Sequence, residues 1–196
     1  IIASMELIRT IDPAQFLAEI RPALQVDEAR NSLILGIVGR LVRDPEYALD
    51  PYLVRVMDGD RLVLAGMRTP PHGLVLTNVG PVSDEALNVL IDDVLAQPEP
   101  PPDVNAPRAL CGRFSQGWVA KTGGQTALKM EQGVYALTEV ASDTLHAAPG
   151  ALRPARPDDL ERFIRWREGF DMDAFGAIHG NRDQLRAFFE KRMGDI

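Results

Sequence analysis

Cysteine and histidine are scarce in this sequence of 196 residues. The single cysteine, Cys111, cannot form a disulfide within the chain, and such usage is typical of a reducing, cytoplasmic setting. The three histidines, His72, His146 and His179, are far apart in sequence, and none has another histidine or a cysteine at metal-ligand spacing. We therefore expect no metal site.

Long apolar runs and an excess of positive charge are also missing. No apolar run reaches the roughly 18 residues of a membrane-spanning helix, and no N-terminal stretch has the three regions of a signal peptide. We therefore expect no membrane partner. The formal net charge is -7, which argues against nucleic acid as a partner, because such binding depends on neutralising phosphates. Residues 1–4 precede Met5, which we take as the native start after a remnant.

The composition is otherwise that of a globular protein, with 45% hydrophobic residues. Residues 62–95 form its most regular stretch. Two short runs rich in Val and Leu, residues 62–67 and 73–79, predict strands joined by a turn at residues 69–72. After Gly80 and Pro81, Ser83 is a predicted N-cap, and an apolar residue recurs at helical spacing up to Leu95.

The rest of the chain supplies strands and helices on both sides of this stretch. Asp12 and Pro13 predict a helix start, Pro22 a kink or restart of that helix, and Asn31-Ser32 the cap of a second helix. The other predicted strands are residues 5–10, 52–57, 103–104, 126–140 and 151–156, and the other predicted helices are residues 107–121, a helix from Pro157, and one capped by Asn181.

The order of these elements resembles that of the GNAT superfamily of N-acetyltransferases. Residues 31–37, 66–72 and 152–160 are moreover similar to bacterial two-lobed GNAT proteins, in which a GNAT-like lobe precedes the lobe that holds the cofactor site. The resemblance implies an α/β (α+β) fold with a mixed, mostly antiparallel central sheet flanked by helices. It also implies a first lobe over residues 1–140, a linker over 141–150, and the incomplete start of a second lobe over 151–196.

The resemblance breaks down at the loop that would bind the cofactor. GNAT enzymes hold the pyrophosphate of acetyl-CoA on a loop of the form Gln or Arg-x-x-Gly-x-Gly or Ala, between the fourth strand and the next helix. The equivalent residues here, 78–83, include one glycine and Pro81, which lacks a backbone N–H. Asp84 and Glu85 follow, and their charge disfavours a polyanion. We expect no tight binding of acetyl-CoA to the first lobe, and no catalytic residue can be assigned.

The function implied is acetyl transfer from acetyl-CoA to the amine of a small molecule or peptide, carried out by a longer parent protein in the cytoplasm. The chain alone is then mostly the non-catalytic lobe and inactive. The alternative is a non-catalytic GNAT-like binding or interaction module. Residues 151–196 are too few to hold a core alone, so we expect them to pack on the first lobe or a neighbouring chain, or to be mobile. A homo-oligomer is left open.

Nine residues are candidates to line a groove in the first lobe: Met67, Arg68, Thr69, His72, Leu76, Thr77, Asn78, Val79 and Gly80. His72 is an acid–base candidate, although a solvated side chain on a rigid turn is the simpler reading. Other reactive groups also favour a structural interpretation. These are a buried thiol at Cys111, a solvated face at Asp92 and Asp93, a helix end at Gly123-Gly124, and a charged helix face at Arg162, Arg165, Trp166 and Arg167. Ser115 and His146 have no spacing that supports a catalytic triad.

Overall fold

The computed structural model describes residues 5–141, 150–151 and 153–193. The chain divides into two compact units, Ile1–Ala136 and Leu137–Ile196. Most of the predicted linker, at residues 142–149, lies outside the described residues, as does His146.

The first unit alternates strands and helices in the predicted order up to α4. Its elements are β1 (Met5–Arg9), α1 (Pro13–Leu24), the short 3₁₀ helix η1 (Gln25–Asp27), α2 (Glu28–Arg43), η2 (Pro45–Tyr47), β2 (Tyr52–Asp58), β3 (Arg61–Arg68), β4 (Leu74–Asn78), α3 (Asp84–Leu95), β5 (Val104–Asn105) and α4 (Arg108–Thr122).

The strands form one sheet in the order β1-β2-β3-β4-β5. The first four pair antiparallel, whereas β5 runs parallel to β4 and pairs only with its first two residues, Leu74 and Val75. Beyond Val75, β4 therefore has no strand on that side in the described part of the chain. The predicted class, a mixed fold with a mostly antiparallel sheet flanked by helices, is confirmed.

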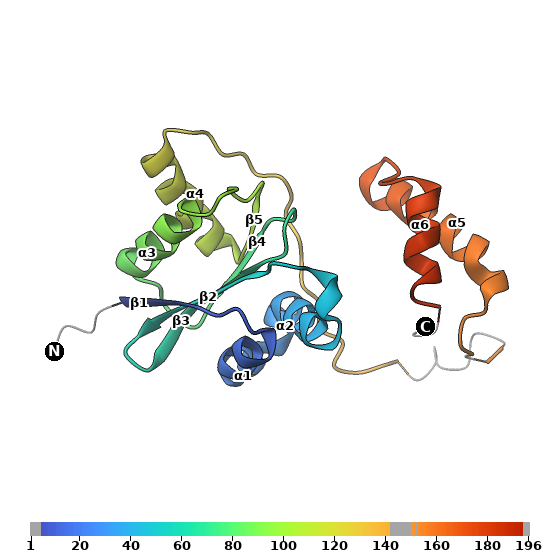
Figure 1. Ribbon diagram of the computed structural model, residues 1–196, viewed down its shortest axis with the longest axis horizontal. Helices are drawn as coiled ribbons and strands as arrows, with labels where there is room; N and C mark the ends of the chain where they lie inside the picture. Colours follow the sequence, from blue (N-terminus) through green and yellow to red (C-terminus); the bar gives the residue numbers. More distant parts are fainter. Residues whose placement is uncertain (1–4, 142–149, 152, 194–196) are drawn as a thin grey trace. The chain divides into compact units, whose positions relative to one another are not determined.

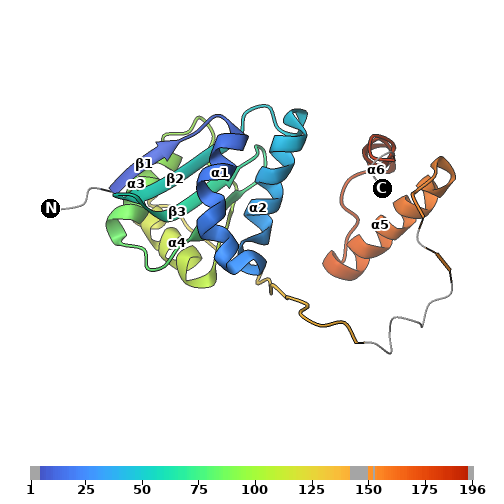
Figure 2. The ribbon, with the colours of Figure 1, turned by 90° about the horizontal axis from the view of Figure 1, so that it is seen from below.

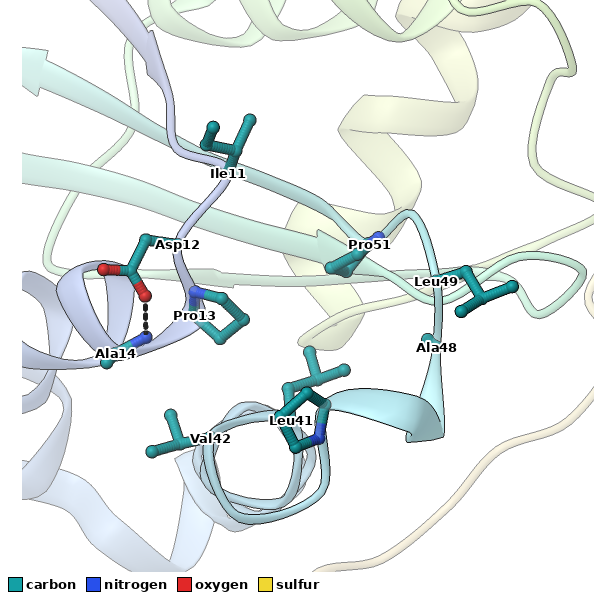
Figure 3. Close-up of a pocket in the computed structure, with 10 residues that line it drawn as sticks. Ile11, Asp12, Pro13, Ala14, Leu41, Val42, Ala48, Leu49 and Pro51 are labelled. Atoms are coloured by element: carbon teal, nitrogen blue, oxygen red, sulfur yellow. Dashed lines mark hydrogen bonds between the residues drawn. The ribbon is translucent and has the colours of Figure 1, made fainter.

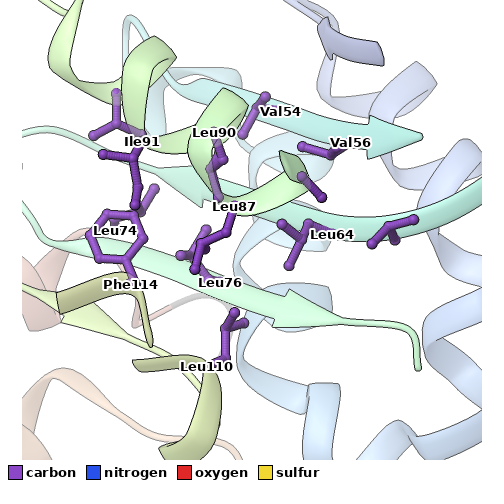
Figure 4. Packing of buried hydrophobic residues seen from close by; sticks show 13 residues of the cluster. Val54, Val56, Leu64, Leu74, Leu76, Leu87, Leu90, Ile91, Leu110 and Phe114 are labelled. Carbon is purple, nitrogen blue, oxygen red and sulfur yellow. The ribbon is translucent and has the colours of Figure 1, made fainter. Parts of the chain in front are cut away.

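Helices cover both faces of the sheet (Figures 1 and 2). α1 and α2 pack on one face, and α3 and α4 pack on the other. Each face thus has its own hydrophobic core. Figure 4 shows the core beneath α3 and α4, where Leu87, Leu90 and Ile91 of α3 lie over the valines and leucines of the strands. Removing each such side chain from water contributes about 1.5–3 kcal/mol, so the two cores hold the layers together.

Several helix ends follow the sequence signals. The Asp12 carboxylate accepts the Ala14 N–H at 2.8 Å, and Ser83 Oγ accepts the Ala86 N–H at 3.1 Å, so both predicted N-caps are confirmed. Gly123 has a φ of 68° and ends α4, as predicted. α1, however, runs through Pro22 without a restart. Pro22 is exposed and lies in the last turn of the helix, where water can satisfy the carbonyl that loses its partner.

The predicted cap at Asn31-Ser32 is wrong. α2 begins one turn earlier, at Glu28, and the Asp27 carboxylate caps it by accepting the Arg30 N–H at 3.4 Å. Asn31 lies inside the helix with its side chain buried. Because the Asn31 amide bonds to main-chain and side-chain groups of other elements, it serves as a buried connector instead of a cap.

Two predicted strands are also wrong. Residues 126–140 are neither strand nor helix and are exposed, and no strand forms among residue 151 and residues 153–156. A strand exists only when a neighbour pairs with it, so alternating sequence alone cannot create one.

The second unit contains two helices, as predicted. After a 3₁₀ turn, η4 (Pro157–Asp159), come α5 (Leu160–Phe175) and α6 (Arg182–Glu190). The predicted capping box of α6 is confirmed: the Gln184 N–H donates to Asn181 Oδ1 at 2.8 Å, and the Asn181 N–H donates to Gln184 Oε1 at 3.1 Å. Phe163 and Phe189 stack with ring centroids 5.6 Å apart and join the helices, while Phe170 and Phe188 remain about half exposed.

Candidate functional site

The link between β4 and α3 borders a hollow of about 240 Å³. β4 ends at Asn78, and Gly80 takes a φ of 73°, a left-handed conformation that lets the chain turn towards α3. The hollow is lined by residues from this link, from α2 and from the start of α4, namely Arg30, Asn78, Gly80, Pro81, Val82, Pro107, Ala109, Leu110 and Arg113.

Both arginines of the hollow are already engaged. Arg30 Nη2 donates to Asn78 Oδ1 at 2.7 Å, and Asn78 Nδ2 donates to the Gly80 carbonyl at 2.6 Å. Arg113 Nη1 donates to the Val82 carbonyl at 2.7 Å, and its Nη2 pairs with Asp84 at 2.5 Å. An anion entering the hollow would have to compete with these protein acceptors.

The polar side chains of this link are either engaged by the protein itself or negatively charged. Ser83 Oγ takes the Ala86 N–H at 3.1 Å, and the carboxylates of Asp84 and Glu85 lie in the first turn of α3. Both acids place negative charge where a phosphate would use the helix dipole. The hollow is also smaller than the roughly 300–1,000 Å³ typical of ligand pockets.

The structure separates the nine groove candidates. Asn78 and Gly80 line the hollow. Met67 is buried in the core beneath α1 and α2, whereas Leu76 is buried in the core on the α3 and α4 side. Thr77 is buried and Val79 packs against the α1 and α2 side. These nine side chains therefore do not line one common groove.

Arg68 anchors the turn at residues 69–72. Arg68 as a whole is only 6% exposed, and its guanidinium donates from Nε to the His72 carbonyl at 2.8 Å and from Nη1 to the Glu99 carbonyl at 2.7 Å. Thr69 is buried and accepts the His72 N–H through its carbonyl at 3.0 Å. The His72 side chain is exposed, with no charged partner among the described residues. This geometry favours a rigid turn held by a buried arginine.

The sequence reading missed a polar cluster at the β1 edge of the sheet. Arg9 donates to both carboxylate oxygens of Asp93, and Tyr52 donates its hydroxyl to Asp93 Oδ2 at 2.6 Å. Burial and the hydrogen bond to Asp93 raise the pKa of Tyr52 far above its usual value. Asp92 pairs instead with Lys121 at 2.7 Å, so the two adjacent carboxylates serve different partners. No signal in the sequence joined residues so far apart.

Cys111 and the arginines of α5 also lie among structural contacts. Cys111 is half buried, with Sγ 3.9 Å from the Val104 carbonyl. Arg162 lies 3.6 Å from Asp159, and Arg167 lies 2.9 Å from the buried Asp171. Trp166 is exposed beside them. These contacts favour the structural readings of both features.

A second hollow, of about 250 Å³, lies where α1 begins and the η2 turn follows α2 (Figure 3). Its walls are mainly apolar, with Leu41 and Val42 on one side and Pro13 beside Asp12 on the other. The Asp12 carboxylate is engaged with the Ala14 N–H. Asp12 is the one ionisable side chain among the lining residues, so this hollow offers mainly apolar contact area.

Within residues 5–141, 150–151 and 153–193, no cluster of three His, Cys, Asp or Glu side chains could hold a metal ion. In the same residues, no helix has the length and apolar character needed to cross a membrane. Comparison of the sequence with protein-family models, and of the protein with curated proteins and solved structures, finds no match.

Proposed function

We propose that this chain is part of a GNAT-type N-acetyltransferase, which transfers an acetyl group from acetyl-CoA to the amine of a small molecule or a peptide in the cytoplasm. The order and pairing of the elements in the first unit carry the proposal. A strand, two helices, three antiparallel strands, a helix, a parallel strand and a further helix follow one another, as the resemblance implies.

The first unit is the non-catalytic lobe in this proposal. Its β4–α3 link has the place of a cofactor loop, but Arg113 is neutralised by Asp84, and Ser83 already caps α3. Its contribution is then structural, with Asn78 and Gly80 shaping a surface beside the substrate.

Titration of the chain with acetyl-CoA by calorimetry tests the role of the first unit. We expect no measurable binding to the wild-type chain. The variant Asp84→Ala frees Arg113 from its carboxylate, and Glu85→Ala is the matched control with the same loss of charge. Weak binding of acetyl-CoA by Asp84→Ala and not by Glu85→Ala supports the proposal that Asp84 neutralises Arg113. Tight binding of acetyl-CoA by the wild-type chain contradicts a non-catalytic first unit.

The enzymatic proposal is tested on the gene. We expect the reading frame to continue past Ile196 into a strand followed by Arg or Gln-x-x-Gly-x-Gly or Ala. Given acetyl-CoA and an amine, the longer protein should acetylate the amine and release the CoA thiol. The 196-residue chain is the control in this assay. A stop codon after Ile196, with no acetyl transfer by the chain, would refute the enzyme.

A non-catalytic GNAT-like binding module is the second candidate. One observation favours it: both arginines that line the hollow, Arg30 and Arg113, donate their hydrogen bonds to acceptors of the protein itself. The gene sequence past Ile196 and the acetyl-transfer assay distinguish the binding module from the enzyme. A binding module has neither a cofactor-binding loop nor acetyl-transfer activity.

A further inference from the structure

Residues 126–140 have the sequence of a β-strand without the pairing of one. Leu128, Met130 and Val134 share one side of an extended chain, and Lys129 and Glu131 lie on the other. The described residues give this segment no main-chain hydrogen bond. Its large apolar side chains are all at least half exposed: Leu128, Met130, Val134, Tyr135, Leu137 and Val140.

The beginning of the segment lies beside the last strand of the sheet. Lys129 pairs with Asp103 at 2.5 Å, and Glu131 pairs with Arg108 at 3.0 Å. Asn105 Nδ2 donates to Gln132 Oε1 at 3.4 Å. The start of the segment, the extended trace that follows α4 in Figure 1, is therefore held next to β5 by side chains alone, and residues 126–140 are all exposed. An unpaired edge of this kind is a template for another strand.

We propose that residues 126–140 are a pairing strand and that their partner is the same segment of a second copy of this chain. The charge pattern selects this partner. Antiparallel pairing about Met130 places each Lys129 opposite Glu131 of the other copy and Met130 opposite itself. Parallel pairing would place Lys129 opposite Lys129, which is repulsive.

The existing ion pairs leave room for this contact. The side chains of Lys129 and Glu131 are 77% and 58% exposed, so each can reach a second charge. A contact of this type is the same on both copies and closes with twofold symmetry. Because one strand from each copy buries a small area, we expect a dimer that dissociates on dilution.

Cysteine cross-linking tests the register directly. In a Cys111→Ser background, Met130→Cys brings two thiols face to face across the dyad. Leu49→Cys is the matched control, since Leu49 is 94% exposed and lies outside the segment. Under mild oxidation we expect a disulfide-linked dimer from the Met130→Cys protein at least about tenfold faster than from the control. Equal rates for the two proteins would overturn the proposal.

Charge reversal supplies the second arm, read by sedimentation equilibrium of the full chain. Lys129→Glu or Glu131→Lys alone places like charges opposite each other and should shift the dimer to monomer. The double variant restores opposite charges across the dyad and should recover the dimer, although it replaces the ion pairs with Asp103 and Arg108 by like-charge contacts. A wild-type chain that stays monomeric at every concentration contradicts the proposal, as does a double variant no better than the single ones.

Discussion

Thr77 Oγ1 donates a hydrogen bond to Asn31 Oδ1 at 2.6 Å, between two residues that are each 4% exposed. The amide nitrogen of Asn31 donates in turn to the carbonyls of Leu24 and Asp27 at 2.9 and 3.0 Å. One buried side chain in α2 therefore joins the end of α1, the η1 turn and strand β4. Since β4 leads into the hollow, this amide also sets the position of the Asn78 end.

Replacing Asn31 with leucine should destabilise the first unit by about 2–4 kcal/mol, because two carbonyls and one hydroxyl lose their partner in a buried place. Thr77→Val should cost less, about 1 kcal/mol or slightly more, because the Asn31 amide keeps its two main-chain acceptors. Urea denaturation followed by circular dichroism measures both. Ser32→Ala is the control on the exposed neighbour and should change little. Equal stability of Asn31→Leu and Ser32→Ala would contradict this assignment.

Arg68→Met should destabilise the protein by about 2–3 kcal/mol, since the carbonyls of His72 and Glu99 both lose a charged donor. Arg68→Lys should recover only part of the loss, because an ammonium cannot reproduce the planar fork of a guanidinium. His72→Ala keeps the carbonyl that Arg68 uses and should be nearly neutral. Thermal unfolding of the three variants ranks them, and a His72→Ala protein as unstable as Arg68→Met would show that the imidazole matters.

The sequence predicted those elements whose signals are local. Asp12 and Ser83 predict the starts of their helices because an N-cap depends only on the next few residues. The β3–β4 pair is predicted by two short apolar runs on either side of a turn. Asn31 was misread because its partners, Leu24 and Thr77, come from elements that only the folded chain brings together. A polar residue in an apolar helix stripe looks like a cap until those partners are known.

The candidate site was harder to predict for the same reason. The β4–α3 link lies where the sequence predicts it, between Asn78 and Asp84. That its acids and its proline disfavour phosphates stays a prediction. Arg30 and Arg113, which enter the hollow from α2 and α4, had no signal near the link in the sequence. The strand predicted at residues 126–140 is wrong for a different reason. The alternation of apolar and polar residues is present, but no neighbouring strand pairs with the segment.

Gly66 and Gly36 form a matched pair for testing close packing. A Cβ on Gly66, in the middle of β3, would lie 2.7 Å from Leu76 Cδ2 and 3.0 Å from Val54 Cγ1, so Gly66→Ala should destabilise by about 1–3 kcal/mol through overpacking. A Cβ on Gly36, inside α2, meets nothing within 4 Å, so Gly36→Ala should stabilise by about 0.5–1 kcal/mol. Denaturant midpoints of the two proteins should move in opposite directions, and a Gly66→Ala midpoint that does not fall would show that the sheet can relax.

Asp159 should control the start of α5. Two hydrogen bonds from Arg153, at 2.7 and 3.0 Å, and one from the Arg156 N–H hold the pKa of this carboxyl well below its usual value. Because the pKa is lower in the folded chain, its stabilising effect is complete above the usual carboxyl pKa of about 4 and is lost as the pH falls below it.

Asp159→Asn should therefore loosen the first turns of α5 at neutral pH, seen as faster amide hydrogen exchange in that peptide. Asp158→Asn, one residue earlier and exposed, is the control and should leave exchange unchanged. Equal protection in both variants would mean that the contacts with Arg153 do not order the helix.

Tyr52 makes the last prediction, at alkaline pH. Its phenol is held protonated first by burial and then by the hydrogen bond to Asp93, so its pKa in the folded protein lies far above the ordinary value of about 10. Because folding raises this pKa, the contribution of Tyr52 to the free energy of unfolding is complete below pH 10. It decreases progressively as the pH rises above that value.

Alkaline titration followed by phenolate absorbance measures this directly, as the difference between the wild-type chain and Tyr52→Phe. We expect no contribution from Tyr52 near pH 10, and its ionisation only where the first unit unfolds. Tyr52→Phe removes the hydroxyl while Arg9 still pairs with Asp93, so at neutral pH it should cost only about 1 kcal/mol. A difference titration centred near pH 10 in the folded protein would show that water reaches the phenol and that the Tyr52–Asp93 bond is not maintained.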